Sequence, residues 1–191
     1  CNPTAASIMK RSLPPPAAVA VIDPEPGALH YVTGRKQQVV LSVEALKVMQ
    51  RHRQLRDRDP EAGGMLLATI EPNLVRVVRA TEPTATDRRS RFAFFPTLSH
   101  QQRVIDKQFR SGLHFIGEWH THPEPRPTPS SVDLRSMADC FRDSRHQLAS
   151  LVMLILGTET SFDGLWVSLH TDKNSHRLLL PEGAHNRSPR P

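Results

Sequence analysis

Two histidines and one aspartate, His120, His122 and Asp133, are the residues whose types and spacing best suit chemistry. Successive side chains of an extended strand point to opposite faces, so two histidines separated by one residue share a face. Two imidazoles and one carboxylate are the protein ligands of one kind of catalytic zinc site, whose fourth position is left to water. The sequence therefore predicts one Zn²⁺ per chain, held by these three side chains.

Each part of this pattern also has a simpler explanation. With ten histidines among 191 residues, a His-x-His pair can arise on a surface by chance. Ser130 and Asp133 could serve only as the N-cap and the first-turn acid of a helix. Their placement favours a metal site, because the histidines end an expected strand, 113–119, and the aspartate begins an expected helix, 130–145. Prolines stiffen the segment between the two elements.

Hydrolysis at such a site also needs a carboxylate that takes a proton from water and passes it to the leaving amine. Glu118 lies beside the histidines in the sequence but is expected to point away from His120. Glu61 precedes Gly63-Gly64 and could reach the site from a neighbouring strand, although it could also be an ordinary linker acid. The residues alone leave this choice open.

The surrounding elements are expected to form a mixed sheet flanked by helices, an α/β (mixed α+β) domain. Hydrophobic spacing predicts helices at 42–58, 98–109 and 130–145. Strands are expected at 39–41, 65–70, 74–80, 92–95, 113–119, 151–156, 164–170 and 177–180. Residues 1–27 are expected to be a proline-rich extension with a short strand at 18–22, residues 28–180 the catalytic domain, and residues 181–191 a disordered tail.

The composition of the chain indicates which binding partners and which cellular compartment to expect. The net charge of +6 comes mostly from arginine clusters, and no aromatic-interleaved basic motif accompanies them, so an acidic protein surface is expected rather than nucleic acid. Cys1 and Cys140 cannot build a disulfide framework, and Cys140 is expected in the core. No apolar run is long enough to cross a membrane, and no apolar segment typical of a secretory signal follows the first residues. A cytoplasmic protein is expected.

Three motifs, taken together, resemble a known signature. Glu61 precedes Gly63-Gly64-Met65-Leu66-Leu67, and the later motifs are His120-Thr121-His122-Pro123 and Ser130-Ser131-Val132-Asp133. This combination resembles the JAMM signature of JAB/MPN metalloproteases, over roughly residues 39–170. The resemblance implies a JAB/MPN-like fold, a three-layer arrangement like that of cytidine deaminases. It also implies that Glu61 is the base, that the two histidines and Asp133 bind zinc, and that Ser130 helps to stabilise the oxyanion.

A narrower resemblance concerns 116–123, 127–130 and 154–157, which are similar to bacterial stand-alone JAMM peptidases of ubiquitin-like conjugation modules, especially the deconjugating peptidases of CBASS anti-phage operons. There, an E1-E2 fusion protein attaches the C-terminus of a cGAS-like nucleotidyltransferase to targets, and the peptidase removes it. The resemblance implies a bacterial zinc (iso)peptidase that cleaves after such a C-terminus. The loop 81–91 and the basic clusters are candidates for holding the conjugated tail. The alternative is a JAMM peptidase of another bacterial ubiquitin-like system.

Other classes of protein share parts of this residue pattern. A zinc deaminase requires Pro-Cys-x-x-Cys, which is absent. A cupin would carry its glutamate on a strand, whereas Glu124 follows Pro123. A RadC-like JAB protein shares part of the pattern but not the Gly-Glu-Trp that precedes His120. A non-catalytic MPN scaffold, used only for assembly, remains the main alternative that is not an enzyme.

Overall fold

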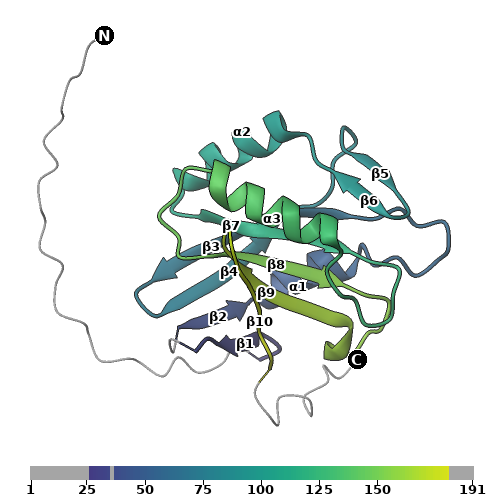
Figure 1. The fold of residues 1–191 in the computed structure, drawn as a ribbon, viewed down its shortest axis with the longest axis horizontal. Helices are drawn as coiled ribbons and strands as arrows, with labels where there is room; N and C mark the ends of the chain where they lie inside the picture. Colours follow the sequence, from purple (N-terminus) through teal and green to yellow (C-terminus); the bar gives the residue numbers. More distant parts are fainter. Residues whose placement is uncertain (1–25, 35–36, 181–191) are drawn as a thin grey trace, which may run out of the picture.

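The computed structural model describes residues 26–34 and 37–180, which form a mixed sheet with helices on both faces (Figure 1). Eight strands make up the sheet: β1 (Leu29–Val32), β2 (Gln38–Leu41), β3 (Gly63–Glu71), β4 (Leu74–Ala80), β7 (His114–Thr121), β8 (Leu151–Leu156), β9 (Leu165–His170) and β10 (Ser175–Arg177). Their order across the sheet is β1-β2-β4-β3-β7-β8-β9-β10. The pairs β2–β4 and β7–β8 are parallel, and the other neighbours are antiparallel. The strand that ends in the histidines is therefore central.

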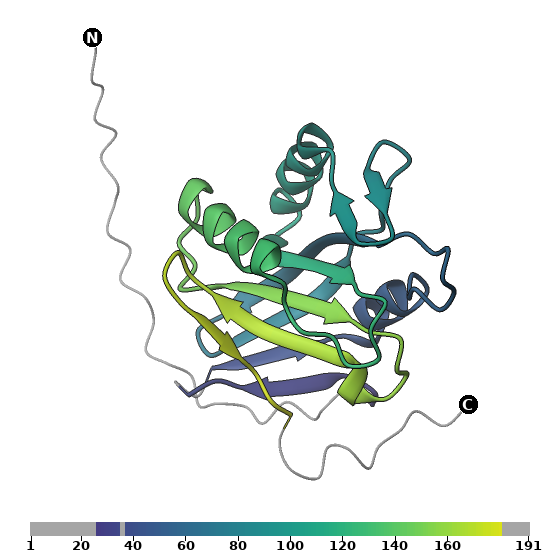
Figure 2. The ribbon, with the colours of Figure 1, turned by 45° about the vertical axis from the view of Figure 1, so that its right-hand side comes forward.

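Helices cover the two faces of this sheet and complete three layers. Helix α1 (Val43–Gln50) buries Ala45, Leu46 and Met49 in the larger core on one face. Helix α3 (Ser131–Asp143) packs Met137 onto the opposite face, against side chains of β8. Helix α2 (Leu98–Phe109) lies on the same side as α3, and its residues are at most half-buried (Figures 1 and 2). The predicted α/β fold with a mixed sheet and flanking helices is confirmed.

A small hairpin stands beside the sheet and was missed in part by the sequence prediction. Strands β5 (Arg88–Ser90) and β6 (Ala93–Phe95) pair antiparallel as a separate sheet. The second strand was expected at 92–95, but the first falls in the segment 81–91, which was predicted to be a loop. Every residue of β5 is exposed, so it carries no hydrophobic alternation that would reveal a strand. In Figure 2 the hairpin projects next to α2.

A bulge in β7 decides which way the site residues point. The pairing of β3 with β7 shifts register between Leu66 and Leu67, so that one residue of β7 is skipped. Gly117 allows this, because its φ is 147° and a Cβ there would lie 1.9 Å from the carbonyl oxygen of Val152. Phe115, before the bulge, packs in the core under α3. The alternation of faces therefore restarts after the bulge.

Several predicted boundaries were wrong. The helix that follows the Ser42 N-cap ends at Gln50 instead of continuing to 58, and 51–58 forms turns in which Gln54 is buried. Strand β1 was not predicted, and the last strand lies at Ser175–Arg177 rather than at 177–180. The predicted strand at 18–22, the tail 181–191 and all but the end of the extension 1–27 lie outside the described residues. Within 26–34 and 37–180, the helices are all too short or too polar to cross a bilayer.

Candidate metal centre

The end of β7, the start of β3 and the start of α3 meet at one place. His120 pairs with Gly63 in the antiparallel β3–β7 ladder. Glu61 precedes Gly63 by two residues and therefore lies beside the end of β7. His122 follows that strand, and its backbone N–H donates to Leu156 of β8 at 2.8 Å. Asp133 reaches the same place from the first turn of α3. The tertiary structure thus brings together all the residues for which the JAMM resemblance implies a metal-binding or acid–base role.

The two imidazoles face one carboxylate at matched distances. Asp133 Oδ1 lies 3.5 Å from Nε2 of His120, and Asp133 Oδ2 lies 3.5 Å from Nε2 of His122. The imidazole rings themselves are 4.9 Å apart, centroid to centroid. On the other side, an oxygen of Glu61 lies within 4.8 Å of a nitrogen of each histidine. The histidines are therefore flanked by two carboxylates.

The geometry fits a bound cation. His120 Nε2 is buried and has no hydrogen-bond partner among residues 26–34 and 37–180, which is costly for a polar atom unless something else binds it. Two ligand atoms about 2.0–2.1 Å from a tetrahedral zinc lie about 3.3–3.4 Å apart. Each of the two 3.5 Å contacts, which involve different oxygens of Asp133, is close to that spacing. Among the described residues, ligand atoms of Glu61, His120 and His122 lie within 4.8 Å of one another and form a group that could hold a metal ion, and Asp133 adjoins both histidines.

Ser130 and Asp133 form a capping box at the start of α3. The backbone N–H of Ser130 donates to Asp133 Oδ2 at 2.7 Å, and the backbone N–H of Asp133 donates to Ser130 Oγ at 3.2 Å. The predicted N-cap is therefore confirmed. The box fixes the orientation of the carboxylate that faces the histidines, as an outer hydrogen bond does for a metal ligand.

Burial and neighbouring charges give the two carboxylates of the site very different pKa values. Glu61 is 6% exposed, and burial raises its pKa to about 7; His122 opposes this shift and Asp133 adds to it. For Asp133, burial alone would raise the pKa, but contacts with His120 and His122 outweigh it and hold that pKa well below its usual range. One carboxylate thus exchanges a proton near neutral pH while the other stays ionised, which is the division expected of a base and a ligand.

Glu118 is not placed as predicted. It was expected to point away from His120, but it lies two residues before His120 and shares its α3-facing side of β7. There burial, together with the charge of Glu118, raises the pKa of the Cys140 thiol. Glu118 is half-buried, and burial raises its pKa to about 7. Cys140 packs against the core under α3, as expected. Trp119 is 1% exposed on the opposite face, where it fills the larger core.

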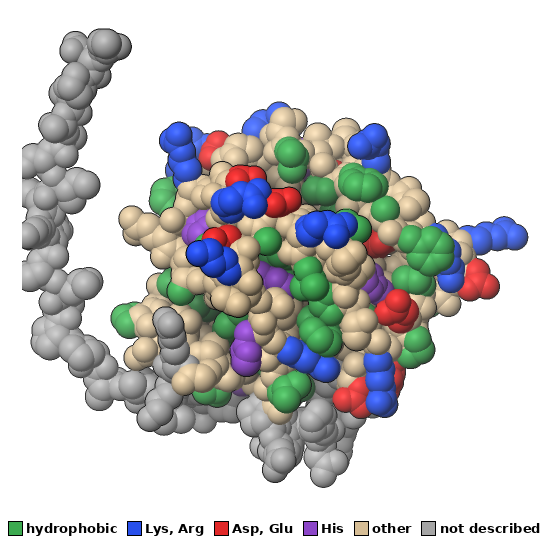
Figure 3. Space-filling view, viewed as in Figure 1, with side chains coloured by type: hydrophobic (Ala, Val, Ile, Leu, Met, Phe, Trp, Pro, Cys, Tyr) green, Lys and Arg blue, Asp and Glu red, His purple; other side chains and the backbone are tan. Residues whose placement is uncertain are grey.

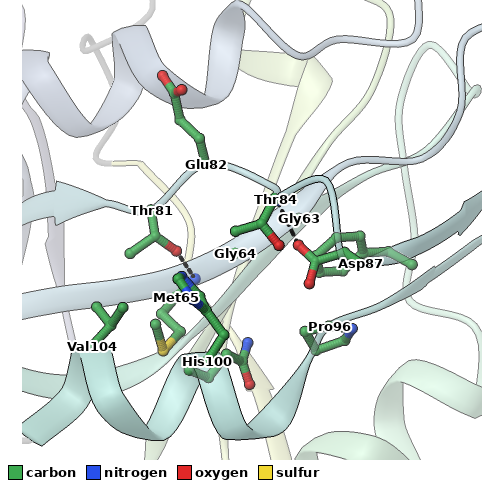
Figure 4. Close-up of a pocket in the computed structure, with 12 residues that line it drawn as sticks. Gly63, Gly64, Met65, Thr81, Glu82, Thr84, Asp87, Pro96, His100 and Val104 are labelled. Carbon is green, nitrogen blue, oxygen red and sulfur yellow. Dashed lines mark hydrogen bonds between the residues drawn. The ribbon is translucent and has the colours of Figure 1, made fainter.

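A cavity behind the Gly63-Gly64 start of β3 has a volume of about 20 Å³, room for roughly one water molecule. It is closed by Thr81, Thr84 and Asp87 on one side and by α2 on the other (Figure 4). The centre itself lies at the surface, with side chains of His120 and His122 that are 12% and 13% exposed. The two imidazoles are therefore mostly buried and only partly accessible from the surface.

The residues that hold Glu61 in place were not predicted from the sequence. The backbone N–H of Glu61 donates to Ser90 of β5 at 2.7 Å, and its carbonyl oxygen accepts from Arg89 Nε at 2.7 Å. In the neighbouring segments, the Gln54 side chain donates to the carbonyl oxygen of Asp59 and accepts from the hydroxyl of Thr121. No motif or periodicity points to these contacts, because they join parts of the chain that are far apart in sequence.

One protein family and several known proteins are similar to this chain. Residues 43–168 match the family described as prokaryotic homologs of the JAB domain. A CD-NTase/cGAS isopeptidase from Pseudomonas aeruginosa is 36% identical over 118 residues, which are 58% of this chain and 74% of the relative. One from Vibrio cholerae is 32% identical over 122 residues, 62% of this chain and 76% of the relative.

Two further matches are more distant. A probable metalloprotease from Sinorhizobium fredii is 29% identical over 131 residues, which are 65% of this chain and 77% of that protein. The solution structure of a protein from Desulfitobacterium hafniense matches with a TM-score of 0.53 at 21% identity, over 72% of this chain and 87% of that chain, and supports the fold alone. The chain belongs to the prokaryotic homologs of the JAB domain and is a JAMM-type hydrolase related to the CD-NTase/cGAS isopeptidases.

Proposed function

We propose that the chain is a zinc-dependent isopeptidase that releases a cGAS-like nucleotidyltransferase from proteins to which its C-terminus is conjugated. The observation that carries this proposal is the convergence of Asp133 on both histidines, 3.5 Å from each Nε2, with Glu61 on their other side. Two imidazoles and a carboxylate are the donor set of a catalytic zinc site, and a further carboxylate serves proton transfer. The relatives named as isopeptidases support the reaction class.

In this proposal His120, His122 and Asp133 hold Zn²⁺, which when bound supplies Lewis-acid polarisation. Glu61 accepts a proton from the attacking water and donates it to the departing lysine amine. A pKa raised to about 7 suits both transfers, because such a group is neither a strong acid nor permanently protonated at neutral pH. The two roles require only that the Glu61 carboxylate stay beside the histidines.

Ser130 has a second role in this scheme. Its Oγ accepts from the backbone N–H of Asp133, which leaves the hydroxyl proton available to donate elsewhere. Ser130 is exposed at the tip of α3, next to the carboxylate that faces the histidines. We propose that this hydroxyl donates a hydrogen bond to the oxyanion of the tetrahedral intermediate.

The hairpin β5–β6 is the proposed binding surface for the extended tail of the substrate. It adjoins Glu61 through the 2.7 Å bond to Ser90 and exposes Phe92 (74%) and Phe95 (54%). Arg88 and Arg91 lie over these two rings. Basic and acidic side chains are interspersed on the face shown in Figure 3, whereas a nucleic-acid surface would gather basic ones. The arginines of the hairpin favour a substrate tail with some acidic character.

The proposed setting is a bacterial cytoplasm in which an E1-E2 fusion protein makes the conjugate during CBASS anti-phage defence. Residues 28–180 form the proposed catalytic domain. The alternative substrate is a ubiquitin-like protein of another bacterial conjugation system, and the alternative without catalysis is an assembly scaffold. All three alternatives share the fold. The first two differ in the protein that the chain cleaves, and in the third the chain cleaves nothing.

The test is cleavage of a cGAS-like nucleotidyltransferase fused at its C-terminus to a reporter, with the zinc content measured in parallel. We expect cleavage at the junction, one zinc per chain, and a large but incomplete loss of cleavage rate in Glu61→Gln with zinc retained. Glu118→Gln is the matched control, because Glu118 lies on the same face of β7 but has no proposed role. Cleavage only of a ubiquitin-like fusion would redirect the substrate assignment. A protein without zinc, or without any cleavage, would favour the scaffold.

A further inference from the structure

A buried glutamine lies behind Glu61 and contacts three segments that meet there. Gln54 is 2% exposed, although it sits in the polar turns that follow α1. Its Nε2 donates to the carbonyl oxygen of Asp59 at 3.1 Å and to that of Arg91 at 2.8 Å. Its Oε1 accepts from the hydroxyl of Thr121 at 2.9 Å. Both amide protons and the amide oxygen of one side chain are therefore used.

Thr121 extends this link to the residue next to Glu61. Thr121 is fully buried and lies between the two histidines. Its Oγ1 accepts from the backbone N–H of Ala62 at 3.0 Å, and its own N–H donates to the carbonyl oxygen of Ala62 at 2.8 Å. Since Oγ1 accepts from Ala62, its hydroxyl proton is directed to Gln54, which fixes the orientation of the amide.

The hairpin holds the other side of the same segment. Arg89 donates through Nε to the carbonyl oxygen of Glu61 at 2.7 Å and through Nη2 to that of Pro60 at 3.2 Å. Ser90 accepts from the Glu61 backbone N–H. The chain leaves β5 at Arg91, whose carbonyl oxygen accepts from Gln54. Gln54 thus joins the hairpin, the segment that carries Glu61 and the end of β7.

We propose that Gln54 is a positioning residue that sets the place of Glu61 relative to His120 and His122, acting through Thr121. The proposal rests on the assignment of Glu61 as the base. Removal of the amide would leave two buried carbonyl oxygens and one hydroxyl without their partners, and the segment before β3 would shift to regain them. A displacement of about 1 Å at a reacting group can cost about 100-fold in rate.

The principal test is a double-mutant cycle between Gln54→Met and Glu61→Gln, measured on the zinc-loaded full chain with the reporter fusion as substrate. Gln54→Met is expected to lower kcat about 10- to 100-fold while KM changes less than about twofold and the zinc content stays at one per chain. In the Glu61→Gln background the same change is expected to lower the residual kcat less than about threefold. A merely structural effect would lower both backgrounds equally, and that result would overturn the proposal.

A second pair keeps the test valid if Gln54→Met does not fold. Thr121→Val removes the connecting hydroxyl while keeping the shape of the side chain, and Thr121→Ser restores it. We expect Thr121→Val to lower kcat about 10-fold or more and Thr121→Ser to recover most of that loss. Equal rates in the two variants would contradict the proposal.

Ser168→Ala is the matched control for lost stability. Ser168 is 1% exposed and bonds Trp166 and His170 on β9, which is separated from the histidine strand by β8. We expect it to lower the melting temperature without a change in kcat. If Glu61→Gln cleaved normally, the base assignment itself would fail. If Glu61→Gln were inactive while Gln54→Met kept its full kcat, the positioning role alone would fail.

Discussion

Asp133 and Ser130 each hold the other in place: the Asp133 carboxylate accepts from the Ser130 N–H at 2.7 Å, and the Ser130 Oγ accepts from the Asp133 N–H at 3.2 Å. The same carboxylate faces His120 and His122 at 3.5 Å. The start of α3 and the candidate metal centre are therefore one structure. A change at Asp133 has two consequences, for the helix and for the metal, and these can be separated by the choice of substituent.

The first prediction separates the cap from the ligand. Asp133→Asn keeps a side-chain oxygen for the Ser130 N–H but loses the charge, so we expect zinc to be lost while the chelator-treated protein unfolds at nearly the same denaturant concentration. Asp133→Ala loses both and should unfold with about 1 kcal/mol less stability. Zinc content and denaturant unfolding measure the two effects. An Asp133→Asn protein that keeps full zinc affinity would contradict the ligand assignment.

The second prediction concerns the titration of Glu61. Burial raises its pKa to about 7, so in metal-free protein half of the Glu61 carboxyl groups are protonated near neutral pH. A cation bound at the neighbouring histidines favours the ionised form and should lower that pKa. Because only the ionised form accepts a proton, kcat/KM should fall as the pH drops through the lowered value. Carboxyl ¹³C NMR with and without zinc, using Glu61→Gln to assign the signal, checks the direction. An unchanged midpoint would place Glu61 away from the metal.

The third prediction concerns stability in acid, through His170. Burial lowers the pKa of His170 to about 4, from a value near 6.5 in the unfolded chain. The unfolded state therefore binds more protons between these two values, and stability is lost as the pH falls from about 6.5 to about 4. The loss from this group amounts to about 3 kcal/mol. Above pH 6.5 it contributes no pH dependence.

Urea unfolding of the chelator-treated protein at a series of pH values measures the His170 effect. His170→Gln removes the titration and should flatten the dependence over that window, while the remaining slope reports other groups. Equal slopes in His170→Gln and the unmodified protein would contradict the assignment.

The fourth prediction tests the bulge that orients the histidine strand. Gly117→Ala would place a Cβ 1.9 Å from the Val152 carbonyl oxygen at a φ of 147°, so β7 and β8 would have to separate. We expect a loss of more than about 2 kcal/mol in stability. Gly112→Ala is the control, since Gly112 also has a positive φ but open space around it, and it should cost about 1 kcal/mol. Thermal unfolding compares the two, and equal losses would show that the contact with β8 is unimportant.

The sequence was informative wherever local physics decides the structure. The N-caps at Ser42 and Ser130, the bounds of α2 and the buried strand β8 all follow from side chains that act within a few residues. The JAMM-like motifs also identified the residues that converge at the candidate centre, because each motif places its functional group at the end of an element. The roles of those residues stay predictions until they are tested.

Other features depended on contacts between distant segments. The face on which Glu118 lies was predicted wrongly, because residues separated by one position in a strand share a face and Glu118 therefore lies on the face of His120. The bulge at Gly117 instead places Phe115 and Glu118, three residues apart, on the same face of β7. The end of α1 was also missed, since tertiary hydrogen bonds of the buried Gln54 stabilise turns in place of further helix.

By itself, then, the sequence determined which side chains could bind a metal and transfer a proton, because the chemistry of a side chain does not depend on the fold. Only the tertiary structure decided the 3.5 Å spacing of Asp133 from both histidines and the burial that raises the pKa of Glu61. Distances and desolvation arise from packing between β3, β7 and α3, and no local pattern encodes them.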